Sequence, residues 1–206
     1  FYIDSGTPSK FYQEYMNQAR SPEDQIFEEK DINQGLYEGV CRYDEDYGSW
    51  YIKFDDGSQE YVNLFMGVDP ASTLAEYADF SVIMVVGVTA KHDYYVIEYW
   101  RQRVLPMECA EKIFTLYKEY QPMRRINIET ITYQEMLRDY VQRRSKDEGL
   151  FLPGVEKGIK NYGNQKKKDR LFEGLQPMFK QGAVHLKRTH TEFIGELLDF
   201  PKGSHD

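Results

Sequence analysis

Two acidic residues directly follow short apolar segments that have the composition of buried β-strands. Asp69 follows LFMGV at residues 64–68, and Glu129 follows RINI at residues 125–128. If a helical crossover returns the second strand parallel to the first and beside it, both carboxylates emerge at one edge of the sheet, roughly 4.8 Å apart in strand spacing. Like charges at that separation raise each other's pKa, and a cation that prefers oxygen ligands relieves the repulsion. Two such ions about 4 Å apart can stabilise both the attacking and the leaving oxygen when a phosphodiester bond is broken.

Each of these acids also has an ordinary structural interpretation. Asp69-Pro70 is a common way to open a turn, and a glutamate at a strand end is often simply hydrated. Asp79 lies in the polar loop between two apolar segments, where it could cap the loop. Asp206 follows the last expected helix and could reach the edge that carries Asp69 and Glu129.

Basic residues gather in one part of an acidic chain. The net charge is −8, which argues against nucleic acid as a general ligand, but residues 156–170 hold six basic and two acidic residues. Part of this segment is expected to begin a helix, where cations oppose the helix dipole unless a phosphate binds there. The alternative is a solvated run of charge, and we favour contact with a DNA backbone. The candidate DNA-binding residues are Lys160, Lys166, Lys167, Lys168 and Arg170.

Other arginines divide into two groups. Arg143 and Arg144 belong to an expected helix and are predicted to face solvent. The further candidates for contact with DNA are Arg101, Arg103, Arg124 and Arg125.

Several classes of protein are disfavoured by composition. The longest apolar run, residues 80–88, is too short to cross a bilayer, and no secretory signal opens the chain. Cys41 and Cys109 are far apart and fit neither a disulfide framework nor a CxxC zinc site, so we expect a reducing cytoplasm. No Ser-His-Asp or Cys-His arrangement indicates a covalent nucleophile. The chain starts at Phe1 rather than Met, and we therefore expect a fragment or a processed piece.

The pattern of apolar residues predicts the elements that position the acids. Helices are expected within residues 1–34, and the turn signal Asp56-Gly57 indicates a small antiparallel β unit at residues 35–63. Strands are expected at residues 64–68, 80–89, 94–100 and 125–129, the first two buried on both faces. Helices are expected at residues 107–120, after Thr132, around residues 166–181 and after a capping box at Thr189 and Glu192, with short strands at 150–154 and 183–186. The fold class is α/β: a mixed sheet of three antiparallel strands followed by parallel βα units, flanked by helices.

Taken in order, several motifs are similar to those of a known family. Five segments together resemble the nuclease domain of the large terminase subunit of tailed bacteriophages. They are GVDPA, the following DFSVIMVVGV, INIET, NQKKKDRLFEGLQPMFKQGAVHL and ELLDFPKGSHD. The resemblance covers about residues 64–206 and implies a ribonuclease-H-like fold. FYQEYMNQARSPEDQIFEEKDI resembles the segment that joins the terminase motor domain to the nuclease. We therefore expect linker helices at 1–34, a small β unit at 35–63 and a nuclease domain at 64–206.

The resemblance also implies roles for individual residues. By match, Asp69, Glu129 and Asp206 would be the catalytic residues and would bind two Mg²⁺ or Mn²⁺ ions, with Asp79 as an accessory metal ligand. The family's C-terminal motif has a second aspartate next to the first. Whether Asp206 or such a following residue is the principal ligand stays open.

The expected activity is metal-dependent cutting of concatemeric viral DNA during genome packaging, with a water activated by two ions attacking in line. The implied partners are double-stranded DNA, the motor domain, the small terminase subunit and the portal, in the host cell cytoplasm and without a membrane. The isolated domain is expected to be monomeric, and it has no GxxxxGK[ST] motif for ATP hydrolysis. Two alternatives stay open: a Holliday-junction resolvase or transposase-like nuclease, and a non-catalytic module that binds DNA or a partner through residues 35–63.

Overall fold

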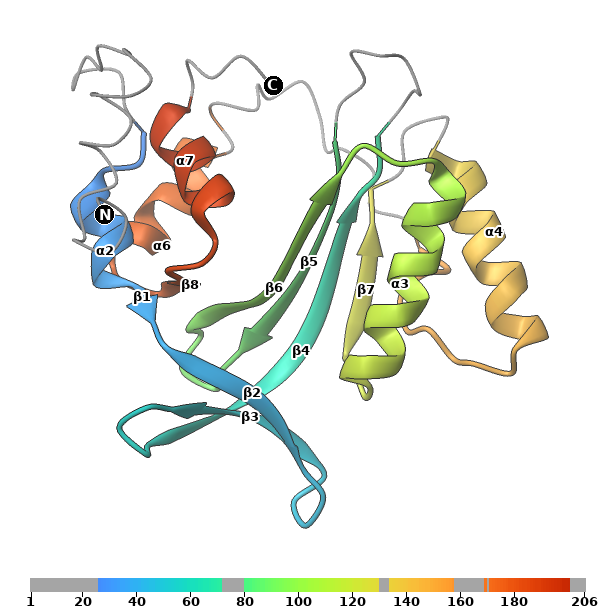
Figure 1. The fold of residues 1–206 in the computed structure, drawn as a ribbon, viewed down its shortest axis with the longest axis horizontal. Helices are drawn as coiled ribbons and strands as arrows, with labels where there is room; N and C mark the ends of the chain where they lie inside the picture. The colour runs from blue at the N-terminus through green and yellow to red at the C-terminus, as the bar shows by residue number, and fades with distance from the viewer. Residues whose placement is uncertain (1–25, 72–79, 130–133, 158–168, 170, 201–206) are drawn as a thin grey trace.

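A mixed eight-stranded sheet with helices on both faces is the framework of the protein (Figure 1). The computed structural model describes residues 26–71, 80–129, 134–157, 169 and 171–200. The strands are β1 (Leu36–Tyr37), β2 (Gly39–Asp44), β3 (Ser49–Phe54), β4 (Gln59–Asp69), β5 (Ser81–Val88), β6 (Tyr94–Gln102), β7 (Arg125–Ile128) and β8 (Val184–Lys187). The helices are α2 (Glu29–Gln34), α3 (Pro106–Tyr120), α4 (Gln134–Asp147), α6 (Gln176–Lys180) and α7 (Thr191–Asp199). The α/β class and the mixed sheet expected from the sequence are confirmed.

Strand β4 connects the two parts of the sheet. The order is β1-β8-β6-β5-β4-β3-β2, and β7 pairs with β4 in addition. The first half of β4 pairs with β3, and its second half lies between β5 and β7. Strands β2 and β3 thus form an arm that extends from the main sheet at the bottom of Figure 1. The expected Asp56-Gly57 turn joins β3 to β4, with Gly57 at a φ of +86° and the Phe54 N–H donating to the Ser58 carbonyl at 3.0 Å.

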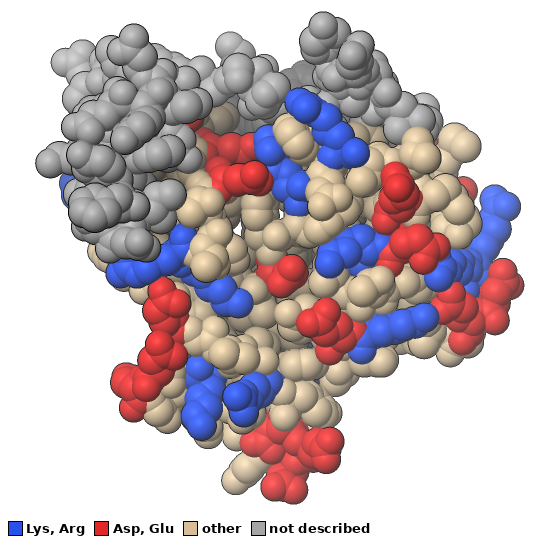
Figure 2. All heavy atoms as spheres, in the orientation of Figure 1, with Lys and Arg blue, Asp and Glu red and all other residues tan. Residues whose placement is uncertain are grey.

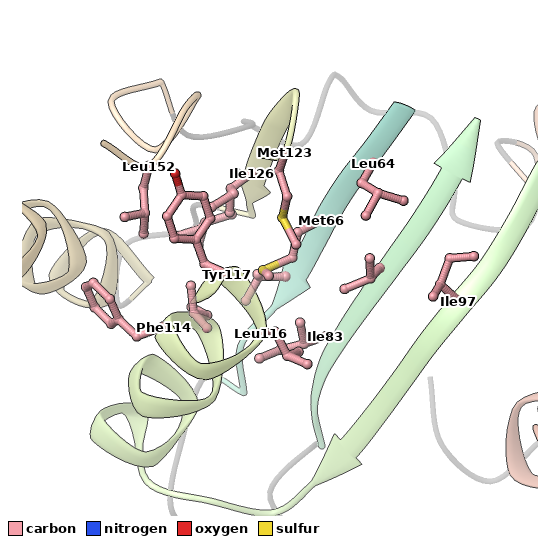
Figure 3. Packing of buried hydrophobic residues seen from close by; sticks show 14 of the residues in the cluster. Leu64, Met66, Ile83, Ile97, Phe114, Leu116, Tyr117, Met123, Ile126 and Leu152 are labelled. Carbon is pink, nitrogen blue, oxygen red and sulfur yellow. The ribbon is translucent and has the colours of Figure 1, made fainter. Parts of the chain in front are cut away.

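One face of the sheet is covered by α3 and α4. Alternate residues of β4 point into this core, among them Leu64 and Met66, and they meet Phe114 and Leu116 of α3 (Figure 3). Ile126 of β7 is fully buried in the same cluster. Removal of these side chains from water is the main stabilising contribution in this half of the protein.

The other face of β4 is not buried, and the expectation that residues 64–68 are covered on both sides is wrong. Asn63, Gly67 and Asp69 are exposed, and Phe65 is half-buried. The apolar run misleads because Gly67 adds to its hydrophobic appearance but has no side chain to bury, and because α3 and α4 pack on a single face.

A second core lies on the opposite face, over β5, β6 and β8. Phe27 and Ile32 pack there with Phe179 of α6 and Leu198 of α7. The Gln176 Nε2 donates to the Ile26 carbonyl at 2.6 Å. Residues 26–34, assigned to a linker in the sequence, therefore contact the C-terminal helices directly.

Three local predictions are wrong. Residues 150–154 form no strand: they run along β7, where the Ile126 N–H donates to the Pro153 carbonyl at 2.7 Å, and Pro153 has no N–H to continue a ladder. Helix α7 begins after His190 without a side-chain cap, so the capping box at Thr189 is absent. Arg144 is not solvent-facing, since it pairs with Glu111 and Glu148 and lies over the Phe114 ring.

Two further observations concern the cysteines and membrane-spanning helices. Cys41 and Cys109 are both free thiols. No helix within the described part of the chain is both long and apolar enough to span a membrane.

Shortening Ile126 tests how strongly β7 depends on this core. Ile126→Val should lower the free energy of unfolding by about 1 kcal/mol and Ile126→Ala by about 2–5 kcal/mol, because each leaves a cavity at a fully buried position. Urea unfolding followed by circular dichroism measures both. Val40→Ala is the matched control, since Val40 is 56% exposed and its loss should change stability by less than about 0.5 kcal/mol. A loss below 1 kcal/mol for Ile126→Ala would show that β7 is not anchored by this cluster.

Candidate active site

The parallel pairing of β4 with β7 places Asp69 and Glu129 side by side. Val68 is aligned with Ile128, and the Glu129 N–H donates to the Val68 carbonyl at 2.9 Å, so the next aligned pair is Asp69 and Glu129. Aligned residues of neighbouring strands point to the same face of a sheet and lie roughly 4.8 Å apart. The two acids therefore share one edge and one face, as the strand-end argument requires.

A buried hydroxyl fixes the backbone just after Asp69. The Ala71 N–H donates to the Ser81 Oγ at 3.0 Å, and Ser81 is only 2% exposed at the start of β5. The Cys109 thiol of α3 lies below the same point: burial raises its pKa to about 11, a hydrogen bond with Ser81 opposes this, and the Asp69 carboxylate adds to the rise. The strand end that carries Asp69 is thus tied to β5 and α3 from the inner side.

Arg101 of β6 lies on the same face of the sheet as the acids, and its side chain is held by neighbouring residues. Asp69 is opposite Val82, and Val82 is opposite Arg101, so Arg101 lies on the same face two strands away, at roughly 9–10 Å. Its guanidinium lies 3.3 Å from the centre of the Phe80 ring and 2.6 Å from the Glu196 carboxylate of α7. Arg103 also lies over Phe80, at 4.2 Å. This arrangement attaches α7 to the edge of the sheet that carries Asp69 and Glu129.

The residues present fit a divalent, oxygen-preferring cation. Two carboxylates converge, and Asn127, two residues before Glu129 on the same face, has an Oδ1 that is buried and lacks a hydrogen-bond partner among the described residues. Carboxylate and amide oxygens are the ligands that Mg²⁺ and Mn²⁺ prefer. A buried carbonyl oxygen without a donor is costly, and a cation or its water would satisfy it. Within the part of the chain that the structure describes, no group of three or more acidic, histidine or cysteine residues converges.

The remaining predicted site residues belong to segments outside the described part of the chain. Asp79 and Asp206, the other predicted metal ligands, lie outside the described residues. The same holds for the whole predicted DNA-binding set, Lys160, Lys166, Lys167, Lys168 and Arg170.

Sequence reasoning missed two residues at this site. Ser81 opens an apolar strand, and its contact with Ala71 depends on the antiparallel pairing of β4 and β5. Asn127 is the polar residue in RINIE, and the alternation of that segment does indicate that residue 127 faces the same way as Glu129.

Removing the Ser81 hydroxyl should loosen the strand end. Ser81→Ala leaves the buried Ala71 N–H without an acceptor, which should lower stability by about 1–3 kcal/mol and speed amide exchange at Ala71. Hydrogen exchange read by NMR or mass spectrometry measures this directly, and Ser81→Thr, which keeps the oxygen, should restore protection.

Ser145→Ala is the matched control for that experiment. Ser145 is also buried and its hydroxyl donates to the Gln142 carbonyl at 2.8 Å, but it belongs to α4, away from Asp69. Its loss should leave exchange at Ala71 unchanged. Equal exchange at Ala71 in Ser81→Ala and wild type would show that Ser81 does not hold this end of β4.

Comparison with known proteins agrees with the resemblance seen in the sequence. Residues 66–205 match the family model described as Terminase RNaseH-like domain. Similar solved structures include the human cytomegalovirus terminase nuclease domain (14% identity, TM-score 0.49, 70% of this chain and 78% of that chain) and a Mn-soaked, inhibitor-bound form of that domain (14%, 0.42, 61% and 64%). Another is the P22 large terminase nuclease domain (10%, 0.49, 84% and 77%). Among curated proteins, none matches the chain.

The family model covers well over half of the chain, so the assignment rests on it rather than on the distant structural likenesses. The ribonuclease-H-like fold expected from the sequence is thereby confirmed. The chain belongs to the terminase RNase H-like domain family.

Proposed function

We propose that this protein is a metal-dependent endonuclease that cuts viral DNA during genome packaging. Membership of the terminase family supports a nuclease role in packaging. The observation that carries the proposal is the parallel register of β4 and β7, which brings Asp69 and Glu129 to one edge of the sheet. The substrate is concatemeric double-stranded DNA, and the partners are the motor domain, the small terminase subunit and the portal.

Asp69 and Glu129 hold two Mg²⁺ or Mn²⁺ ions in this proposal. Such ions, when bound, supply Lewis-acid activation of water and of the phosphate at neutral pH. Asp69 and Glu129 would hold the ions through their carboxylate oxygens, and Asp69 is the more exposed of the two. Asp206 or a residue after it, with Asp79 as an accessory, would complete the donor set. The products would carry 3′-hydroxyl and 5′-phosphate ends.

The basic segment supplies affinity for the DNA backbone in this scheme. Lys160, Lys166, Lys167, Lys168 and Arg170 would contact phosphates, and contacts of this kind carry no base information. Cutting should therefore show little sequence preference. The protein would act in the host cell cytoplasm, with ATP hydrolysis carried out by the motor rather than by this chain.

Neutralising either acid should abolish cutting. Asp69→Asn and Glu129→Gln each replace a negatively charged metal ligand with a neutral amide of the same size. Supercoiled plasmid should then stay intact with Mn²⁺ under conditions in which the wild type nicks and linearises it. Agarose gel electrophoresis over time measures the loss. Glu135→Gln, in the first turn of α4, is the matched control and should cut as the wild type does. Cutting by Asp69→Asn at the wild-type rate would refute the assignment.

Metal binding should also be visible without catalysis. Because a ligand that binds only the folded state stabilises it, Mn²⁺ at about 100 times its Kd should stabilise the wild type by about 2.7 kcal/mol. Asp69→Asn should lose the response to Mn²⁺, because it lacks the negative charge that attracts the cation. Differential scanning calorimetry with and without Mn²⁺ measures both. An identical Mn²⁺-induced shift in the wild type and Asp69→Asn would place the metal elsewhere.

Branched substrates separate this proposal from the resolvase alternative. A packaging nuclease should cut linear duplex and a four-way junction at similar rates. Much faster cutting of the junction would favour a resolvase, and duplex binding without any metal-dependent cutting would favour a non-catalytic module.

A further inference from the structure

The outer face of β4 forms an exposed strip that runs toward Asp69. Residues 61, 63, 65, 67 and 69 alternate regularly onto one face, opposite the core. On the neighbouring strand β7, Arg125 is aligned with Phe65 and Asn127 with Gly67. We call the surface formed by Asn63, Phe65, Gly67, Arg124 and Arg125 the β4–β7 strip. It leads along the sheet directly to the acid pair.

Two arginines give the strip positive charge, and no ion pair with an acid of the described residues offsets it. Arg124 and Arg125 are exposed, and among the described residues neither lies within ion-pair distance of an acid. The Arg124 Nε donates instead to the Asn63 Oδ1 at 2.7 Å, which leaves its terminal nitrogens available. One guanidinium held by Asn63 and a second exposed one beside it, neither paired with an acid of the described residues, suit an anionic ligand.

The absence of a side chain at Gly154 leaves room for the side chain of Arg125. Its φ of +92° lets residues 153 and 154 turn close to β7, and a Cβ at this position would lie 2.6 Å from the Arg125 Cγ. The Arg125 side chain therefore lies against bare backbone on one side.

The strip is also open above Gly67. A Cβ added at Gly67 would meet no atom of the described residues within 4 Å, and the residue has an ordinary strand conformation. Bare backbone in the middle of a sheet often marks a place where another chain approaches closely. Here it lies between Phe65 and Asp69, on the line from the two arginines to the acids.

Acidic residues gather at the two turns of the arm, β2–β3 and β3–β4. In Figure 2, positive and negative side chains are interleaved, and acidic ones gather at the lower end, where Figure 1 places the turn between β2 and β3. Asp44 on this arm accepts the Tyr61 hydroxyl at 2.9 Å, and Asp55 and Asp56 occupy the other turn. These carboxylates would repel phosphate at the turns and leave the strip as the favourable path.

We propose that the β4–β7 strip is the path along which duplex DNA reaches the acid pair, with Arg124 and Arg125 contacting its phosphates and the sugar-phosphate backbone passing over Gly67. The proposal rests on the nuclease function proposed above. Phe65 is four residues from Asp69, which is roughly 13 Å along a strand. At 3.4 Å per nucleotide, Arg125 would contact a phosphate about four nucleotides from the bond that is cut.

Adding bulk at Gly67 is the sharpest test. Gly67→Val meets no clash and puts a β-branched residue into a strand, so stability should be unchanged or slightly higher. Affinity for a fluorescein-labelled 20-base-pair duplex, measured by anisotropy in EDTA, should nevertheless fall by roughly tenfold, which corresponds to about 1.4 kcal/mol. Arg125→Gln should weaken binding and reduce the slope of log K against log salt by about 0.9, as expected for one lost phosphate contact.

Arg143→Gln is the matched control, since Arg143 is an exposed arginine of α4, which packs on the other face of the sheet. It should bind the duplex as the wild type does. If both Gly67→Val and Arg125→Gln bind the duplex with wild-type affinity, the strip is not the path of the DNA. A wild type that does not bind the duplex would refute the proposal as well. Plasmid cutting with Mn²⁺ by the same proteins separates the two proposals: if the wild type cuts and Asp69→Asn does not, the nuclease function stands even where the strip fails.

Discussion

The parallel pairing between β4 and β7 determines what this protein can do. It aligns two strand ends, and it brings Asp69 and Glu129 within roughly one strand spacing of each other on one face. Such a pair of carboxylates is electrostatically unfavourable unless something positive lies between or beside them. The strands that carry the acids are held by a core in which Met66 and Ile126 are fully buried. Along β4 and β7, apolar side chains are thus buried on the inner face of the sheet, and charged side chains are presented on the outer one.

The surroundings of the acids serve the same arrangement. Ser81 holds the backbone after Asp69 from within, and Arg101 attaches α7 to the same edge through Glu196. The second core, formed by α2, α6 and α7, covers the sheet over β5, β6 and β8 and leaves the outer face of β4 exposed. The division of the helices between the two faces therefore decides which part of the sheet is available to a large ligand.

The pairing of Asp69 with Glu129 could be predicted because each acid directly follows a short apolar segment in the sequence. An apolar segment that ends in an acid, a helix, and a second such segment are sufficient to place Asp69 and Glu129 together, provided that the crossover returns a parallel strand. The exposed face of β4 could not be predicted in this way, because Phe65 and Gly67 read as apolar and nothing in the order of residues shows that α3 and α4 pack on one side only. Ser81 was missed for a related reason, since its partner Ala71 becomes visible only when the register of β4 and β5 is known. The segment at residues 150–154 was taken for a strand because its apolar composition outweighed Pro153, which prevents a continuous ladder.

We propose above all that Asp69 and Glu129 share a divalent cation. A crystal of the protein soaked in MnCl₂ and measured at the manganese absorption edge tests it most directly. We expect an anomalous difference peak in contact with a carboxylate oxygen of each residue, and no such peak in Asp69→Asn. The proposal would be contradicted by an anomalous peak found only at another position, or by the absence of any peak at a saturating concentration of manganese.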